Sequence, residues 1–356
     1  MHIRLKLIQV IRGIAATIVI LVHVSSSTLV YFKTEWLYDI FKVGWNGVDI
    51  FFVLSGFIIT FIHFDDLVKK QNIKQFFIKR FNRIYPIFWV VNTVAVGLLV
   101  LTKKYTMHNL FSWFTLKSYL LLSTDVPLLP LRVAWSLCYE VLFYLVFGVC
   151  IILGFRISKI VWAAWLVLIA AYYLFVQRIS PPVVLNPFIL EFLMGCVVGY
   201  IFRLITVDNS KFVSLQNNAI ALIVLGIILF TAMWAVSYLT DYGQKNDIES
   251  RVFYGLSASF IILGAAITDY KKPVKIPALL LLIGDASYVI YLTHFLILAF
   301  VFKIASSVLK QHNSSGIVFL VGVFAIIVAL VCGIICHIFI EKPLLKKVNS
   351  LTLKKA

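Results

Sequence analysis

Residues 7–24 read LIQVIRGIAATIVILVHV, an apolar run that contains one arginine, Arg12, and one histidine, His23. A run of this length predicts a membrane-spanning helix. Ionisable side chains inside such a helix are costly and usually belong to functional sites. Arg12 and His23 are eleven positions apart, about three helical turns, so they project from nearly the same face with about 16 Å between them along the axis. We therefore expect a site with two levels on this face, a cation at one and an imidazole at the other.

The composition excludes a soluble globular protein. Apolar residues make up 62% of the 356 positions and charged residues only 13%, which is typical of a membrane protein with several spans. The net charge of +17 does not indicate nucleic-acid binding, because the basic residues cluster in short loops between apolar runs, where they set membrane orientation. We expect membrane lipids as partners and no nucleic acid.

The hydropathy pattern predicts an all-α fold, a polytopic membrane helical bundle of about ten transmembrane helices. The predicted spans are 8–29, 45–63, 84–102, 133–154, 160–177, 187–205, 218–238, 252–269, 287–305 and 316–340. Alternate loops hold about twenty and about eleven Lys and Arg residues, which predicts that the N- and C-termini are both cytoplasmic. We divide the chain into a membrane domain, residues 1–345, and a short basic cytoplasmic tail, residues 346–356.

One imidazole and three carboxylates are predicted to share the outer to middle layer of this bundle. Asp49 lies about one turn below the outer end of the second span, and Glu140 lies about two turns below the start of the fourth. Glu191 is similarly shallow in the sixth span, and His23 lies near the outer third of the first. An imidazole titrates near neutral pH and suits proton transfer. This layer is therefore the predicted place of acid–base chemistry.

The inner layer is predicted to be cationic. Arg80 and Arg83 belong to FIKRFNRIYPIFW just before the third span, and Tyr85 follows them. Arginines grouped in this way suit phosphate groups, and Arg12 lies at a similar level. The pattern predicts an anionic ligand that enters from the cytoplasm. Anchoring to lipid headgroups explains Arg80 and Arg83 equally well on charge alone.

Other polar residues have structural alternatives. Glu191, and His294 about two turns above the inner end of the ninth span, are as well explained by a hydrogen bond between two helices as by a functional role. Trp135 offers a stacking face for a sugar or belongs to the aromatic belt. The five cysteines lie in apolar spans without the spacing of a disulfide framework or a zinc site, and we predict no metal.

Six ordered motifs together resemble the acyltransferase-three family of integral membrane acyltransferases. They are RGIAA followed by His23, GVDIFFVLSGFII, KRFNRIYP, AWSLCYEVLFYL, ASYVIYLTHF and the terminal EKPL. The resemblance extends over essentially the whole chain and is nearest to exopolysaccharide and O-antigen acetyltransferases. It implies that residues 1–345 are a membrane acyltransferase domain in the bacterial inner (plasma) membrane.

The resemblance also implies a reaction. Members of the family take an acyl group, usually acetyl, from cytoplasmic acyl-CoA and place it on a hydroxyl of a cell-surface or lipid-linked polysaccharide sugar. Acyl-CoA would be a co-substrate, with no permanently bound cofactor. Arg80 and Arg83 would hold its phosphates with Tyr85 beside them, and Arg12 would meet the arm or a phosphate.

The catalytic residues that we predict are His23, Asp49 and Glu140. Acyl transfer to an alcohol needs a base for the hydroxyl proton, and His23 would act either as that base or as a transient acyl carrier. Asp49 or Glu140 would orient its ring. Supporting residues are Ser55, a weaker candidate nucleophile, with Trp135, Glu191 and His294.

Three alternatives stay open at the level of sequence. The donor could carry succinyl instead of acetyl, and the acceptor could be a protein, lipid or small metabolite instead of a glycan. A transporter or flippase for a polysaccharide precursor also explains buried charge in a bundle of many spans. The lack of two evident halves with matched, interrupted spans argues against the transporter.

Overall fold

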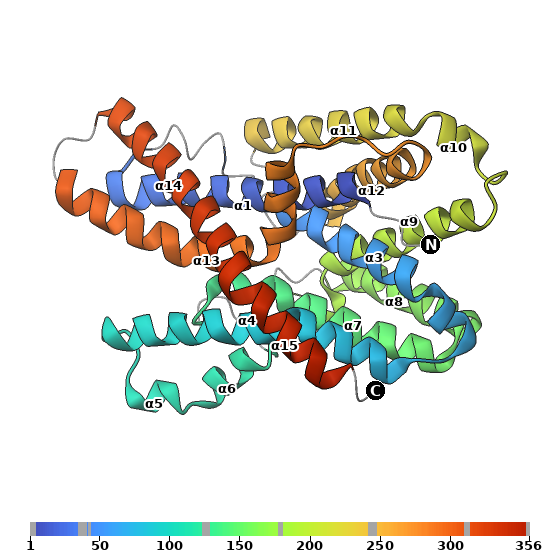
Figure 1. Cartoon of the computed structure of the whole chain (residues 1–356), viewed down its shortest axis with the longest axis horizontal. Helices are drawn as coiled ribbons and strands as arrows, with labels where there is room; N and C mark the ends of the chain where they lie inside the picture. The colour runs from blue at the N-terminus through green and yellow to red at the C-terminus, as the bar shows by residue number, and fades with distance from the viewer. Residues whose placement is uncertain are drawn as a thin grey trace. The chain divides into compact units, whose positions relative to one another are not determined.

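The computed structural model describes residues 5–34, 41, 44–122, 129–176, 181–240, 248–309 and 314–353. Within these ranges the chain is helical and contains no strand, which confirms the predicted all-α fold (Figure 1). The long helices are α1 (Lys6–Phe32), α3 (Gly47–Lys69), α4 (Ile73–Leu101), α7 (Trp135–Leu153), α8 (Phe155–Phe175), α9 (Phe188–Val207), α11 (Ala219–Thr240), α12 (Ile248–Lys271), α13 (Ala278–Leu309) and α14 (Ser315–Cys336). The shorter elements are η1 (Gly44–Asn46), α5 (Met107–Leu110), α6 (Trp113–Tyr119), η3 (Arg132–Ala134), η4 (Val183–Leu185), α10 (Val213–Asn217), the π-helix η5 (His337–Glu341) and α15 (Lys342–Thr352).

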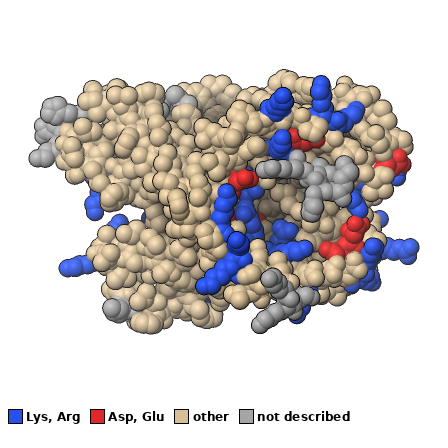
Figure 2. Space-filling model, in the orientation of Figure 1, with Lys and Arg blue, Asp and Glu red and all other residues tan. Residues whose placement is uncertain are grey.

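Ten helices in the described part of the chain are long and apolar enough to cross a membrane, which confirms the predicted number. Apolar side chains on their surfaces are widely exposed, for example Leu101 at 80% and Phe175 at 84%. Figure 2 shows that uncharged residues make up most of this face of the molecule. An apolar exterior is what a lipid environment favours.

Two predicted spans begin nine or more residues after the start of the helix. Helix α4 begins at Ile73, not at residue 84, and α13 begins at Ala278, not at residue 287. Charged residues end a hydropathy window, but they do not end a helix whose backbone hydrogen bonds continue beyond the apolar core. The basic motif that contains Arg80 and Arg83 therefore lies inside a long helix, and Pro86 lies within α4. Helix α15 covers most of the predicted tail, whose residues 354–356 lie outside the described ranges.

The chain divides into two compact units. Unit 1 comprises Met1–Val19, Lys42–Ile73 and Leu145–Asp285, and unit 2 comprises Ile20–Phe41, Lys74–Tyr144 and Ala286–Ala356. Helices α1, α7 and α13 are each divided between the two units.

Unit 1 is held together by close packing of α3 on α9 and of α11 on α12. Gly56 and Gly195 allow the first contact, because a Cβ added to Gly56 would lie 2.1 Å from the Phe192 carbonyl oxygen and one added to Gly195 would lie 2.1 Å from the Val53 carbonyl oxygen. Small residues at a helix interface let two backbones approach in a membrane, where burial from water no longer drives association.

In unit 2, α4 makes polar contacts with two other helices. Trp89 donates a hydrogen bond of 2.9 Å from Nε1 to the Tyr119 carbonyl, which attaches α6. Nearer its start, Asn82 donates from Nδ2 to Asn349 Oδ1 and to Thr352 Oγ1, both at 2.8 Å, which attaches α15. These bonds connect α4 to segments far along the chain and position its arginines.

Candidate active site

Two buried histidines lie side by side in unit 2. His23 of α1 is 8% exposed and His294 of α13 is fully buried, and their ring centroids are 5.0 Å apart with a 45° angle between the planes. Phe295 packs edge-on against the His23 ring at 5.3 Å. This spacing brings the two imidazole rings into contact. The predicted catalytic histidine therefore has a second titratable ring as its neighbour.

The contacts of His294 leave one of its two ring nitrogens without a hydrogen-bond partner among the described residues. Nδ1 lies 3.2 Å from the Ile290 carbonyl, and because a carbonyl only accepts, Nδ1 carries the proton. Nε2 is buried and has no hydrogen-bond partner among the described residues. Tyr291, whose ring centroid is 5.7 Å from that of His294, donates its hydroxyl to the Val133 carbonyl at 2.9 Å. The ring of His294 is thus held in place with a basic nitrogen available.

Both histidines are candidates from the sequence, but the predicted spans do not show that they lie side by side. His23 lies seventeen positions after the start of α1 and His294 sixteen positions after the start of α13. Two helices that enter from the same side would place these residues at equal depth. The predicted start of the ninth span at residue 287 hid this match, since it put His294 only two turns from a helix end.

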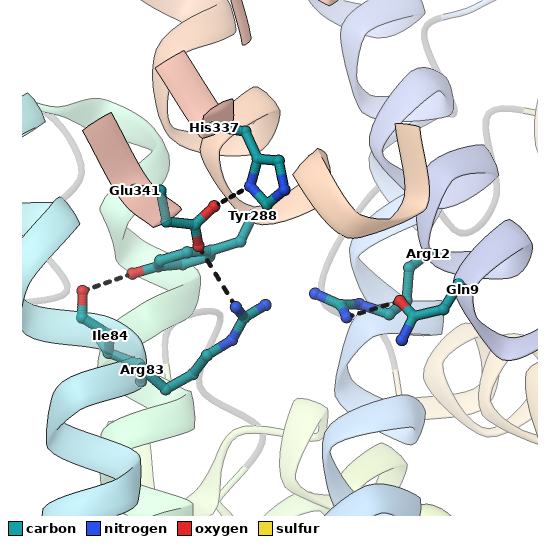
Figure 3. A network of polar contacts seen from close by, with 7 residues as sticks. All are labelled: Gln9, Arg12, Arg83, Ile84, Tyr288, His337 and Glu341. Carbon is teal, nitrogen blue, oxygen red and sulfur yellow. Dashed lines mark hydrogen bonds and ion pairs between the residues drawn. The ribbon is translucent and has the colours of Figure 1, made fainter. Parts of the chain in front are cut away.

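The arginines of α4 meet acidic and aromatic groups of unit 2. Arg83 pairs with Glu341 at 3.4 Å between Nη1 and Oε1, and its guanidinium lies 5.2 Å from the Tyr288 ring centroid. Figure 3 shows Glu341 contacting both Arg83 and His337. Arg80 lies one turn earlier on the same face, with its guanidinium 5.7 Å from the Tyr144 ring. That Arg80 and Arg83 act together on one ligand stays a prediction.

Glu140 of α7 contacts a tyrosine that also faces Arg80. Tyr144 donates its hydroxyl to the Glu140 carboxylate, and the same tyrosine ring faces Arg80. One turn before Glu140 on α7, Ser136 hydrogen-bonds Tyr291 at 2.8 Å, beside His294. Tyr288 and His294 are six positions apart on α13, about 9 Å along the axis. Polar residues of α7 and α13 therefore contact both the arginine group and the histidine pair.

Two further predicted residues lie apart from these contacts. Tyr85 donates its hydroxyl to the Leu120 carbonyl at 3.1 Å and stacks on Phe81 at 4.8 Å. Two positions on a helix differ by about 200°, so Tyr85 faces away from Arg83. The role of Tyr85 beside the arginines in donor binding stays a prediction. Trp135 packs edge-on against Tyr139 at 5.9 Å.

In unit 1, Asp49 forms a buried ion pair with Arg251. Both carboxylate oxygens accept from Arg251 Nη1, at 2.6 and 2.7 Å, and Asn46 Oδ1 accepts from Nη2 at 3.3 Å. Asp49 is fully buried and Arg251 is 4% exposed. The predicted span 252–269 left Arg251 just outside its start, whereas α12 begins at Ile248 and includes it. The partner of Asp49 was missed as a result.

The remaining predicted residues of unit 1 lie on three helices. Glu191 of α9 is fully buried near the Asp49–Arg251 pair, and Ser55 lies partly buried on α3. Arg12 donates from Nη1 to Gln9 Oε1 at 3.0 Å within α1 (Figure 3). His23 belongs to unit 2, so the proposed orientation of its ring by Asp49 stays a prediction.

Comparison with known proteins identifies relatives along most of the chain. The chain is 27% identical over 319 residues to the exopolysaccharide production protein ExoZ of Rhizobium meliloti, covering 86% of this chain and 91% of the relative. It is 28% identical over 287 residues to the peptidoglycan O-acetyltransferase OatA of Listeria monocytogenes, covering 71% of this chain and 45% of the relative.

A second O-acetyltransferase OatA, of Staphylococcus aureus, is 25% identical over 345 residues, covering 89% of this chain and 54% of the relative. The chain thus spans about half the length of the two OatA proteins. No solved structure matches the chain. The ten candidate spans and these relatives show a multi-pass bacterial membrane protein.

The family assignment rests on a match along nearly the whole chain. The family model for the acyltransferase domain matches residues 5–337, which contain the histidine pair, the arginines of α4 and the Asp49–Arg251 pair. This confirms the resemblance drawn from the six sequence motifs. The chain belongs to the acyltransferase domain family.

Proposed function

We propose that this protein transfers an acetyl group from acetyl-CoA to a hydroxyl of a cell-surface or lipid-linked polysaccharide. The names of its relatives support the glycan, since one is an exopolysaccharide production protein and two are O-acetyltransferases, one of them named for peptidoglycan. Membership of an acyltransferase family supports the reaction class. The donor would be bound from the cytoplasm, where both chain termini and the tail 346–356 would also lie.

The single observation that carries the mechanism is the buried His23–His294 pair. His23 would take the proton of the acceptor hydroxyl as its oxygen attacks the thioester carbonyl. The carbon–sulfur bond then breaks, and the CoA thiolate leaves and takes up the proton. In the alternative, a His23 nitrogen attacks first and releases CoA, and the acceptor hydroxyl then opens the acyl-imidazole.

Donor binding would use the arginine group of unit 2. Arg80 and Arg83 share one face of α4 and suit the phosphates of CoA. The contacts from Arg83 through Tyr288 along α13 to His294 support a donor that lies along this helix, with phosphates at one end and thioester at the other. Glu140, held by Tyr144, would support the site between the two ends.

The test is acetyl-CoA turnover by the purified protein in nanodiscs, read as thiol release with a glycan acceptor present. His23→Ala should abolish turnover while the protein stays folded in the membrane. His108→Ala, which replaces an exposed histidine of α5, should leave turnover unchanged. Retained turnover in His23→Ala would rule out both versions of the mechanism, and absence of turnover and of CoA binding in the wild type would rule out the donor.

A further inference from the structure

A π-helical turn, η5, follows α14. Its last residue, Glu341, contacts Arg83 of α4, and its first residue, His337, contacts Glu341. The backbone N–H of Lys342 donates to the carbonyl of His337, five positions back, instead of four. Pro343, next in the chain, has no N–H to donate and its ring crowds the carbonyl four residues earlier. One widened turn relieves this crowding before α15 continues. π-Helical turns are rare and are frequent at functional sites.

The two ends of this turn form a buried pair. His337 donates from Nδ1 to Glu341 Oε2, while Glu341 Oε1 contacts Nη1 of Arg83 at 3.4 Å (Figure 3). Glu341 is fully buried and His337 is 6% exposed. Each carboxylate oxygen therefore has its own partner. Because His337 holds one oxygen, the carboxylate is fixed in direction and cannot swing away from the arginine.

Arg83 is held at one edge and one face. Glu341 contacts one terminal nitrogen, and the Tyr288 ring lies under the guanidinium at 5.2 Å. Tyr288 is itself tied to α4, since its hydroxyl donates to the Ile84 carbonyl at 2.9 Å. The Arg83 side chain is 34% exposed, and its other guanidinium nitrogens have no hydrogen-bond partner in the described part of the chain. A guanidinium has five donors in a fixed plane, so its second edge is open to an anion.

We propose that Glu341, together with His337, is a positioning residue that aims the open edge of Arg83 at a phosphate group of the acyl donor. The choice of donor rests on the proposed function. A free arginine side chain loses much rotational freedom when it binds an anion, and a side chain that is already ordered loses less. Positioning therefore predicts that loss of Glu341 weakens phosphate binding.

The opposite view is that Glu341 competes with the phosphate for Arg83. That view predicts the reverse sign, because removal of a competing negative charge would tighten donor binding. The geometry favours positioning: the contact is a single one at 3.4 Å, and the carboxylate is buried and tied to His337. Glu341→Ala and the nearly isosteric Glu341→Gln both test the sign, and the second variant keeps the volume of the buried side chain.

The experiment measures CoA affinity directly and acetyl transfer separately, in phosphate-free maltoside micelles. Glu341→Ala and Glu341→Gln should weaken CoA binding, the first about tenfold, and raise the KM for acetyl-CoA with kcat within about twofold. In an Arg83→Ala background, Glu341→Ala should have no further effect, since residues that act through one another are not additive. Glu249→Gln, an exposed glutamate of α12, is the matched control and should bind CoA normally.

A phosphate-free donor separates positioning from damage to the fold. S-acetylpantetheine carries the thioester but no nucleotide phosphates, so its turnover should be the same in wild type and Glu341→Ala. Tighter CoA binding in the variants, additive losses in the double variant, or equal losses with both donors would each overturn the proposal.

A last measurement distinguishes binding of the donor phosphate from binding of lipid headgroups. If Glu341→Ala leaves CoA affinity unchanged but lowers retention of anionic lipid in nanodiscs, the phosphate belongs to a lipid and the assignment to the donor is wrong. If the wild type binds no CoA at all, the proposed function fails at its donor, and that failure is separate from an unchanged affinity in the variant.

Discussion

His23 and His294, which are 271 positions apart in the chain, place their ring centroids 5.0 Å apart in unit 2. Each comes from the middle of a long helix, so neither ring belongs to a loop that could move freely. In the usual arrangement a carboxylate orients a catalytic histidine. Here the neighbour of His23 is another imidazole. This ring can accept a proton, whereas the usual carboxylate only orients the histidine.

The first prediction concerns His294. His294→Gln keeps a polar side chain of similar size but removes a ring nitrogen that can accept a proton, so kcat should fall by about 100-fold, the lower end of the usual contribution of proton transfer. The KM for acetyl-CoA should change little, because the phosphates are expected at Arg80 and Arg83. Steady-state kinetics checks this, with His108→Gln as control. A normal kcat would leave His294 a packing residue only.

The second prediction separates the two versions of the His23 mechanism. We expect His23 to act as a general base, so protein incubated with radiolabelled acetyl-CoA and no acceptor should carry no label after denaturation. Acid quench and gel filtration measure the label. A label that is present in wild type and missing in His23→Ala would establish the acyl-carrier version instead.

The third prediction concerns the buried ion pair of unit 1. Arg251→Met leaves the Asp49 carboxylate buried without its partner, which should destabilise the protein by about 3–5 kcal/mol. Adding Asp49→Asn removes the stranded charge and should restore much of the loss. Thermal unfolding in detergent measures both variants.

Arg203→Gln is the matched control for that pair. Arg203 pairs with Asp65 at 2.7 Å, but the two side chains are 30% and 58% exposed. Exposed pairs contribute about 0–1 kcal/mol, so this variant should unfold near the wild-type temperature. Equal losses in Arg203→Gln and Arg251→Met would contradict the assignment of the Asp49–Arg251 pair to the buried core.

The fourth prediction tests the contact of α3 with α9. A Cβ at position 56 would meet a backbone oxygen at 2.1 Å, so Gly56→Ala must push the helices apart and should destabilise by roughly 1–3 kcal/mol. Gly97→Ala is the control, because nothing lies within 4 Å of its Cβ position. In a helix that change should be neutral or slightly stabilising. Similar unfolding temperatures for the two variants would be evidence against the close contact.

Several features of this protein could be read from the sequence because they depend on local properties. The number of spans follows from stretches of hydropathy, and the shared face of Arg80 and Arg83 follows from their spacing on a helix. The family follows from short motifs in order. The helix starts at Ile73 and Ala278 were missed because charged residues end a hydropathy window without ending a helix.

The partners of the polar side chains were decided only by tertiary structure. Asp49 and Arg251 are 202 positions apart, and Arg83 and Glu341 are 258 apart. Spacing along one helix predicts which residues share a face, but it does not predict which other helix packs against that face. That choice depends on how many residues fit together at once. One example is Gly56, whose lack of a side chain allows close contact with the Phe192 backbone. The sequence by itself thus determined the helices and their polar residues, while packing between distant helices determined which of those residues meet.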